Sequence, residues 1–288
     1  MIRLDAATVL LQWAVGGLFF LWFTTRRRQV GLGYGWLLRG TYVIMAAGAC
    51  SFGVAFGFVA VRDIAALLVA VSALAVLITS IAMRRAGVSG ADAEHDRRST
   101  RVAEMTGIER GEVAAGRQGR EFPPALDLIA PLIGSIGLVA AALDASDGGG
   151  RDTLVSMVRT FAGAAFLGAV TDAMLLGHWY LVQPGLPRRH LNDLVQALGI
   201  VWPIEVVSLM LPIGMIAVFT GSVDDGWNGT LGWFWAACAV TTIALVFVTR
   251  AALRERSYSA VMAATGLLYL AILTAFGTDL VARAVLAG

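Results

Sequence analysis

Apolar side chains occupy the chain in long runs, and each run is separated from the next by a shorter polar or charged segment. Windows of about 20 apolar residues occur eight times. A helix of that length crosses the ~30 Å hydrocarbon core of a bilayer. The pattern therefore predicts an all-α polytopic membrane protein, a bundle of eight transmembrane helices. We place the spans near residues 6–24, 37–61, 63–83, 125–143, 159–183, 194–220, 231–249 and 259–285.

One long polar segment divides these spans into two groups. Residues 1–83 hold three spans, and residues 125–288 hold five. Residues 84–124 between them are charged and Gly-rich, which predicts a loop that is partly disordered or carries a short interfacial helix. The second and third spans are separated by only Val61, Arg62 and Asp63, so we expect them to form a tight helical hairpin.

The arginines are distributed unequally between the two sides of the predicted bundle. Alternate connections, together with Arg39, carry 17 of the 22 arginines, whereas the other connections are short and acidic. The positive-inside rule then places the arginine-rich loops in the cytoplasm and both termini outside. The first apolar run is followed by its positive charges, so we interpret it as a spanning helix and not as a cleaved signal peptide.

Composition supports the membrane assignment and removes several kinds of chemistry. Hydrophobic residues make up 58% of the chain and charged residues 15%, whereas soluble domains carry about 25% charged residues. The chain has no lysine, which excludes a Walker A loop, a pyridoxal phosphate aldimine and a retinal Schiff base. Arginine-only, Ala-rich usage is typical of a GC-rich bacterial genome, and we expect the bacterial inner membrane.

Metal and nucleic-acid binding have no support in the sequence. The two cysteines, Cys50 and Cys238, lie in apolar runs, and neither has the spacing of a zinc or iron–sulfur ligand. We interpret both as packing residues. The expected partners are membrane lipids and other membrane subunits or a second copy of the chain, with no nucleic acid.

Two carboxylates lie deep inside predicted spans without a charged partner one turn away. These are Asp172 and Glu205, each placed near the centre of its span. A charge at that depth costs about 2.5–3.5 kcal/mol on insertion scales. Each must therefore be protonated, face water or pair across helices, and Asp172 has Arg39 as one candidate partner. A functional role and a purely structural role explain such residues equally well.

Span eight carries a third carboxylate with a neighbour of opposite charge. Asp279 and Arg283 are four residues apart, the spacing of an ion pair on one helix face. Span six adds Pro203 and Pro212 around Glu205. Prolines break the helical hydrogen-bond ladder, and broken helices often line binding cavities.

His178 has three interpretations, all of which the sequence leaves open. Together with Trp179 it lies near the cytoplasmic end of its span, where it caps the helix, ends a proton route, or helps to bind a quinone or haem. The remaining histidines, His95 and His190, lie in predicted loops, which disfavours a pair of axial haem ligands. No cofactor is predicted.

Two functions therefore compete, and the absence of a binding signature favours the first. It is an integral subunit of a larger bacterial membrane complex, respiratory or otherwise electron-transferring and close to a quinone, with no catalytic activity of its own. The alternative is a proton- or ion-coupled transporter of a small solute that uses Asp172 and Glu205, with Asp279, Arg283 and His178 along the same pathway. An enzyme acting on lipid is a weaker third candidate, because no clustered Asp/His/Arg motif is present.

Overall fold

The structure, a computed structural model, describes residues 5–89, 120–146, 148–183, 185–211, 214–255 and 257–287. The described residues form helices and no strand. Eight helices, counting η2 with α5, are long and apolar enough to cross a membrane, which confirms the predicted number. The long helices are α1 (Ala6–Thr25), α2 (Leu32–Phe56), α3 (Ala60–Ala82), α5 (Ile129–Asp144), α6 (Gly150–Trp179), α7 (Arg189–Met210), α9 (Thr230–Arg254) and α10 (Tyr258–Ala287). The short ones are η1 (Arg84–Ala86), η2 (Pro124–Leu128) and α8 (Gly214–Phe219).

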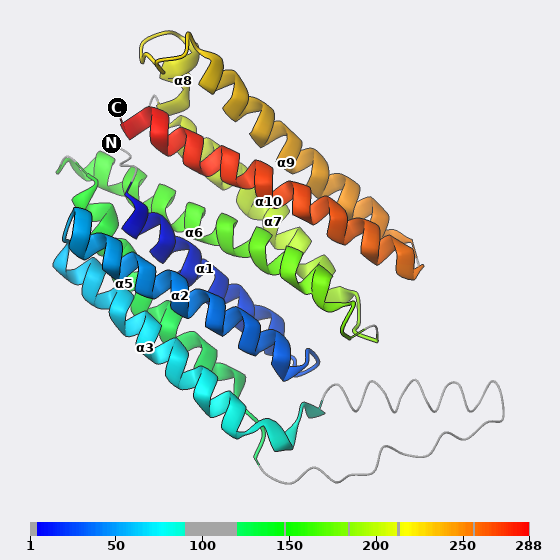
Figure 1. The fold of residues 1–288 in the computed structure, drawn as a ribbon. Helices are drawn as coiled ribbons and strands as arrows, with labels where there is room; N and C mark the ends of the chain where they lie inside the picture. The colour runs from blue at the N-terminus through cyan, green and yellow to red at the C-terminus, as the bar shows by residue number, and fades with distance from the viewer. Residues whose placement is uncertain are drawn as a thin grey trace.

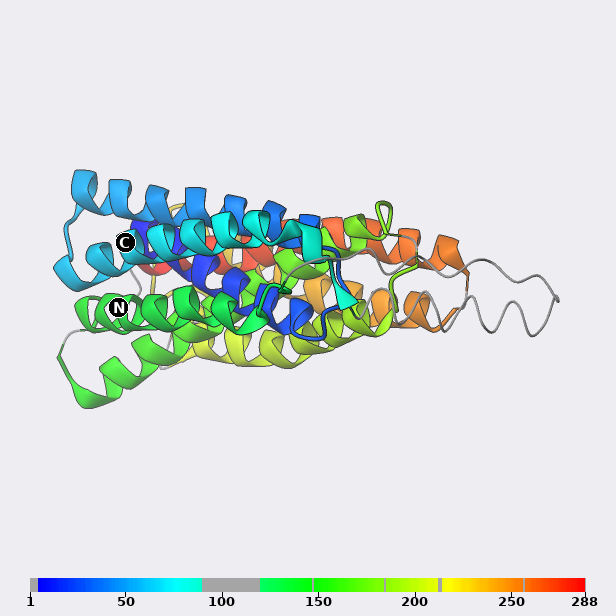
Figure 2. The same ribbon diagram turned by 90° about the horizontal axis from the view of Figure 1, so that it is seen from below.

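The long helices run side by side and alternate in direction (Figures 1 and 2). The connections that follow α2 and α5, the α8 segment and both ends of the chain lie at one end of the bundle, which we call the acidic end (Figure 1). The connections that follow α1, α6 and α9 and the C-terminal end of α3 lie at the other, which we call the arginine-rich end (Figure 1). Which end faces the cytoplasm remains a prediction from the positive-inside rule.

Helix α6 is the centre of the bundle. It packs against α1 and α5 on one side and against α7 and α10 on the other. α1 and α6 approach closely because both carry glycine where they cross: a Cβ added to Gly168 would lie 2.3 Å from the carbonyl carbon of Gly16. Small residues at such crossings let membrane helices gain van der Waals contact along their backbones.

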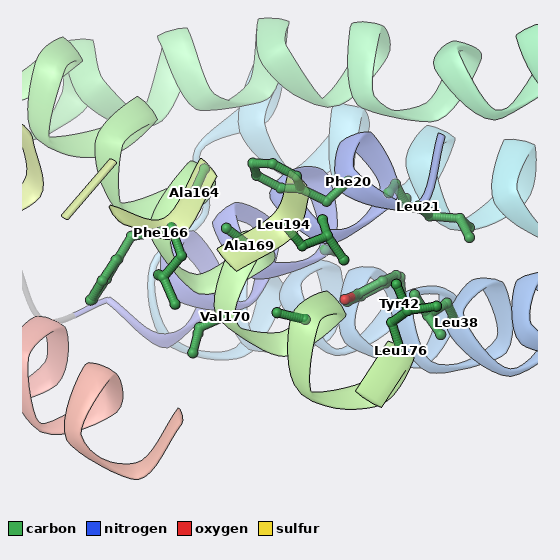
Figure 3. Close-up of a cluster of buried hydrophobic side chains, with 14 of the residues drawn as sticks. Phe20, Leu21, Leu38, Tyr42, Ala164, Phe166, Ala169, Val170, Leu176 and Leu194 are labelled. Carbon is green, nitrogen blue, oxygen red and sulfur yellow. The ribbon is translucent and has the colours of Figure 1, made fainter. Parts of the chain in front are cut away.

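The interior between α1, α2, α6 and α7 is filled by fully buried apolar side chains. Figure 3 shows this core, whose members include Leu21, Leu38, Phe166, Leu176 and Leu194. Large apolar side chains also cover the outside of the bundle, among them Ile44, Phe56, Leu132 and Leu273. An apolar exterior of this kind is what a lipid-embedded bundle requires.

Two connections differ from the sequence-based prediction. The link between α2 and α3 consists of residues 57–59, and Arg62 and Asp63 lie in the first turn of α3, both buried. α3 begins early because the Asp63 carboxylate accepts the Val59 N–H across its first turn.

The predicted sixth span is also divided. α7 continues through Pro203 and ends at Met210, and α8 forms a separate short helix. Pro212 lies outside the described residues, as does most of the predicted loop 84–124, including His95.

A candidate charged site at the acidic end

Glu205 lies near the end of α7 and not at its centre. Met210, the last residue of the helix, is the fifth residue after Glu205, which is about 8 Å at 1.5 Å per residue. Its side chain is fully buried. No donor among the described residues makes a hydrogen bond to either carboxylate oxygen, and the neighbouring carboxyl group is that of Asp279, so a charge on Glu205 is not compensated by hydrogen bonds.

The end of α7 is held by an arginine from α6. Arg159 Nε donates to the carbonyl oxygen of Ser208 at 2.8 Å, and its Nη2 donates to the carbonyl oxygen of Leu211. The last carbonyls of a helix have no intrahelical donors. A cation at this position satisfies them and complements the negative end of the helix dipole. Arg159 also interacts electrostatically with Glu205 across the α6–α7 interface.

The predicted ion pair in α10 is confirmed. Arg283 Nε lies 2.8 Å from Asp279 Oδ2, and both side chains are buried. The pair faces the interior beside Glu205, which interacts electrostatically with both of its members. Asp279 and Glu205, from different helices, therefore share the field of one guanidinium group.

These groups converge on Gly163 of α6. A Cβ built there would lie 2.9 Å from Arg283 Nη2, 3.1 Å from Gln12 Nε2 and 3.3 Å from Asp279 Oδ1. Glycine is needed here because the polar groups fill the space that a side chain would take. Gln12, from α1, is fixed in turn by donation from Nε2 to the Thr160 carbonyl oxygen at 2.6 Å.

Five side chains from four helices thus form one buried group, which we call the acidic-end cluster: Gln12, Arg159, Glu205, Asp279 and Arg283. Its ionisable members lie roughly 6 to 14 Å inside the ends of their helices at the rise of an α-helix. At such a depth ionisable groups either compensate one another or bind something that does so.

A cavity of about 30 Å³ leads toward this cluster from the acidic end. Its mouth includes the exposed Asp144 and the partly exposed Asp5, and its floor is formed by the buried Arg159 and Arg283. A water molecule needs about 10–15 Å³ of such volume, so the cavity has room for about two. The polar residues that line it are Asp5, Thr8, Asp144, Ser156, Arg159, Thr160 and Arg283.

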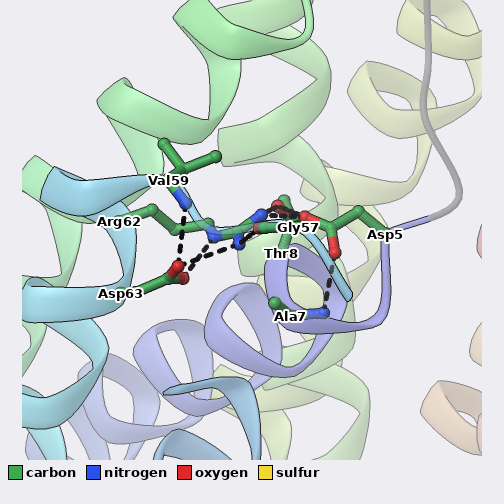
Figure 4. A network of polar contacts seen from close by, with 7 residues as sticks. All are labelled: Asp5, Ala7, Thr8, Gly57, Val59, Arg62 and Asp63. Carbon is green, nitrogen blue, oxygen red and sulfur yellow. Dashed lines mark hydrogen bonds and ion pairs between the residues drawn. The ribbon is translucent and has the colours of Figure 1, made fainter. Parts of the chain in front are cut away.

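A separate network beside the cavity fixes Arg62. Its guanidinium group contacts the carboxylates of Asp5 and Asp63 and donates to the Gly57 carbonyl oxygen at 2.6 Å (Figure 4). Asp5 also accepts the N–H of Ala7 and so begins α1. The network ties the start of α1 to the α2–α3 link, which explains why Arg62 and Asp63 are buried at the end of the bundle.

Asp172 lies in a different part of the molecule. It is fully buried, and the Tyr42 hydroxyl donates to its Oδ1 near the middle of α2. Tyr34 donates to its backbone carbonyl oxygen at 3.3 Å. Oδ2 has no partner among the described residues. Phe166, about halfway along α6 between Asp172 and Arg159, is one of the core side chains that separate Asp172 from the acidic-end cluster.

His178 and Trp179 have different surroundings at the arginine-rich end. His178 is exposed, and its Nδ1 lies 3.4 Å from the Tyr269 hydroxyl, with the rings perpendicular. Trp179 is partly buried beside Tyr34 and donates to Gln183 Oε1 at 3.2 Å.

Arg39, a suggested partner of Asp172, pairs with another residue. Its guanidinium group binds both carboxylate oxygens of Asp127, at 2.7 and 2.8 Å, and both residues are buried. This ion pair joins α2 to η2 at the arginine-rich end. It was not expected, because Asp127 lies close to the predicted start of a span and has no oppositely charged neighbour in sequence.

The structure therefore brings Glu205, Asp279 and Arg283 together and leaves Asp172 and His178 apart from them. Sequence analysis missed Arg159 and Gln12 as members of the cluster. Arg159 had one visible signal, since it is an arginine at the edge of a span on the side that is otherwise poor in arginine.

The described residues contain no group of three or more His, Cys, Asp or Glu side chains placed to hold a metal ion. No family model, curated protein or solved structure was found to match the chain. The candidate site must therefore be interpreted from its own geometry.

Proposed function

We propose that this protein is a proton-coupled membrane transporter of a small solute in which Glu205 carries the coupled proton. The observation that supports this most directly is the state of Glu205. It is fully buried, its oxygens lack hydrogen-bond partners among the described residues, and it lies beside the guanidinium groups of Arg159 and Arg283. A carboxyl group in such surroundings exchanges a proton when the charge around it changes.

The position of the acidic-end cluster supports the same proposal. The cavity links exposed residues at the acidic end to the buried arginines beside Glu205, so a proton or solute from that side has a short path to the cluster. On the other side, core side chains such as Phe166 and Leu176 fill the bundle. Alternating access requires a state in which the site is open toward one side of the membrane and closed toward the other. A cavity on one side of the site and a filled interior on the other match such a state.

Proton movement into sealed vesicles tests the proposal. Proteoliposomes containing a trapped pH-sensitive dye would receive single solutes from four classes: small anions, amino acids, sugars and organic cations. We expect at least one class to change the internal pH with the wild-type protein and to have at least tenfold less effect with Glu205→Gln.

Asp172→Asn provides the matched control, because it removes a second buried carboxylate that lies outside the acidic-end cluster. It should retain most of the wild-type signal. If no solute class moves protons, or if Glu205→Gln behaves like wild type, the transport proposal is wrong.

A second candidate function is a subunit of a larger electron-transfer complex. The observation in its favour is His178, which lies exposed on the surface beside Tyr269 and is accessible to a partner subunit or a quinone head group. Purification in a mild detergent tests it. Co-purifying subunits or quinone that are lost with His178→Ala would support this function, whereas an isolated protein free of both would contradict it.

A further inference from the structure

We propose that the cavity at the acidic end binds a small monovalent anion against Arg159 and Arg283, and that each anion is accompanied by one proton on Glu205. This inference rests on the proposed proton-coupled function and adds the class of substrate. Halides, nitrite and formate belong to that class.

The floor of the cavity has the chemistry of an anion site. Arg159 and Arg283 are both buried and both line the cavity. Guanidinium groups present several N–H donors and keep their charge at any accessible pH. In a low-dielectric environment, such donors bind anions more strongly than they would in water.

The two arginines differ in how their charges are balanced. Arg283 has a direct carboxylate partner in Asp279. Arg159 uses Nε and Nη2 on backbone carbonyl oxygens, and its carboxylate neighbour across the interface is Glu205. Arg159 is therefore the arginine whose counter-ion can be exchanged.

Charge balance then couples the anion to a proton. With every group ionised, the positive charges of Arg159 and Arg283 equal the negative charges of Glu205 and Asp279. An anion added alone would leave one uncompensated negative charge at a buried site, which is strongly unfavourable. Protonation of Glu205 restores neutrality, because the anion replaces Glu205 as the counter-ion of Arg159.

The groups around Glu205 support this exchange. Asp279, Arg283 and Arg159 surround it from α10 and α6. Helix α8 has no titratable residue, and on the acidic half of α9 the one titratable side chain is Cys238, which packs against Gly277 of α10.

The carboxylates of Asp5 and Asp144 line the mouth of the cavity, and Asp5 is already paired with Arg62. The positively charged side chains that line the cavity therefore lie at its floor, and its mouth carries carboxylates.

The size of the cavity limits the anion. A volume of about 30 Å³ accommodates about two water molecules, so a halide or a triatomic anion fits in place of water. Sulfate, gluconate and phosphate esters are larger than this space. The proposed ligand is therefore small and carries one charge.

Anion binding to the purified, full-length protein in detergent tests the inference without any transport step. Sodium chloride, nitrite or formate would be titrated against sodium gluconate at constant ionic strength, with tryptophan fluorescence or thermal melting as the measurement. We expect binding that weakens as the pH rises from 5.5 to 9, by up to tenfold per pH unit. In weakly buffered solution, up to one proton should be taken up for each anion bound.

Two variants separate the roles of the charged groups. Glu205→Gln mimics the protonated carboxyl group, so it should bind the anion with no pH dependence and take up no proton. Arg159→Gln should weaken binding at least tenfold. Since Arg159 also caps α7, this variant can fail to fold, in which case the Glu205→Gln result decides. Asp172→Asn should match wild type in affinity and proton uptake.

The outcomes distinguish this inference from the proposed function. If none of the three anions binds, or if Glu205→Gln retains the wild-type pH dependence, the anion site is wrong. Proton movement driven by a cation or a neutral solute, without anion binding, would keep the transport function and reject the anion. Anion binding without proton movement in vesicles would reject transport alone.

Discussion

Buried polar residues in this protein differ in how well their neighbours compensate them. Arg39 and Asp127 bind each other through two hydrogen bonds, and Arg62 contacts two carboxylates. The partners of such groups compensate their charges, so no ligand is needed to explain their burial. Glu205 lacks such bonds among the described residues. Glu205 is therefore the carboxylate beside which we expect a ligand to bind.

Asp172 is predicted to have a structural role through its hydrogen bond with Tyr42. Tyr42→Phe removes the donor and leaves a buried carboxyl group without it, so it should lower the free energy of unfolding by about 1–3 kcal/mol. Asp172→Asn keeps an acceptor for the tyrosine and should have a smaller effect.

The measurement is equilibrium unfolding of the detergent-solubilised variants, combined in a double-mutant cycle. Additive effects of the two substitutions would show that the Tyr42–Asp172 hydrogen bond contributes nothing to stability.

Among the helices, the α1–α6 contact sets the geometry of the site. It brings Gln12 of α1 against the Thr160 carbonyl oxygen of α6, next to Arg159, where α7 and α10 add their charges. The contact depends on Gly16 and Gly168, whose backbones meet. α6 therefore connects the helices that supply the acidic-end cluster, and its close packing fixes their separation.

A methyl group at Gly168 should separate these two helices. Gly168→Ala would place its Cβ 2.3 Å from the Gly16 backbone, an overlap that only a backbone shift can relieve. Overpacking of this kind typically costs about 1–3 kcal/mol. The matched control is Gly266→Ala in α10, where a Cβ meets no atom within 4 Å and where alanine should stabilise the helix by about 0.5–1 kcal/mol. The melting temperature should fall in Gly168→Ala and rise in Gly266→Ala, each compared with the wild-type protein.

The start of α9 depends on one carboxylate in the preceding connection. Asp225 Oδ1 accepts the N–H groups of Trp227 and Gly229 at 2.9 and 2.8 Å, and Oδ2 accepts that of Leu231 at 2.9 Å. Desolvation acts to raise the pKa of Asp225, but these backbone donors outweigh it and hold the pKa below its usual value. The connection is therefore most ordered when Asp225 is ionised.

Acid should loosen this connection. Since the folded-state pKa is lowered, the stabilisation is complete above the unfolded pKa of about 3.9 and is lost as the pH falls through the folded value. Asp225→Ala should remove it at every pH. Hydrogen exchange at the start of α9 measures the effect, and Asp224→Ala, which removes an acceptor for Gly226 alone, serves as the control. Equal exchange in both variants would contradict the prediction.

The whole molecule has two chemically different ends. The arginine-rich end carries the connections with most of the arginines, and three of the remaining arginines are buried in contacts near the acidic end. Those three, Arg62, Arg159 and Arg283, have carboxylate or carbonyl partners there. They do not oppose the positive-inside rule, because that rule concerns charges exposed in loops next to the membrane.

Fusion reporters test the predicted orientation. With both chain ends at the acidic end (Figure 1), and that end outside, alkaline phosphatase fused after Gly288 should be active and a cytoplasmic fluorescent protein fused there should be dark. The same reporters inserted after Arg120 should give the opposite result. A C-terminal fusion that is fluorescent would show that the protein has the opposite orientation, and the number of spans would be unaffected.

The sequence by itself determined the helical membrane class and the number of spans, because the hydrophobic length of a helix is a local property. It also identified the Asp279–Arg283 pair, whose members are neighbours on one helix. Only the tertiary structure decided which polar residues meet: Glu205 with Arg159, Asp172 with Tyr42, and Arg39 with Asp127. These contacts join residues from different helices, and their pairing depends on how the helices pack, which no local pattern records.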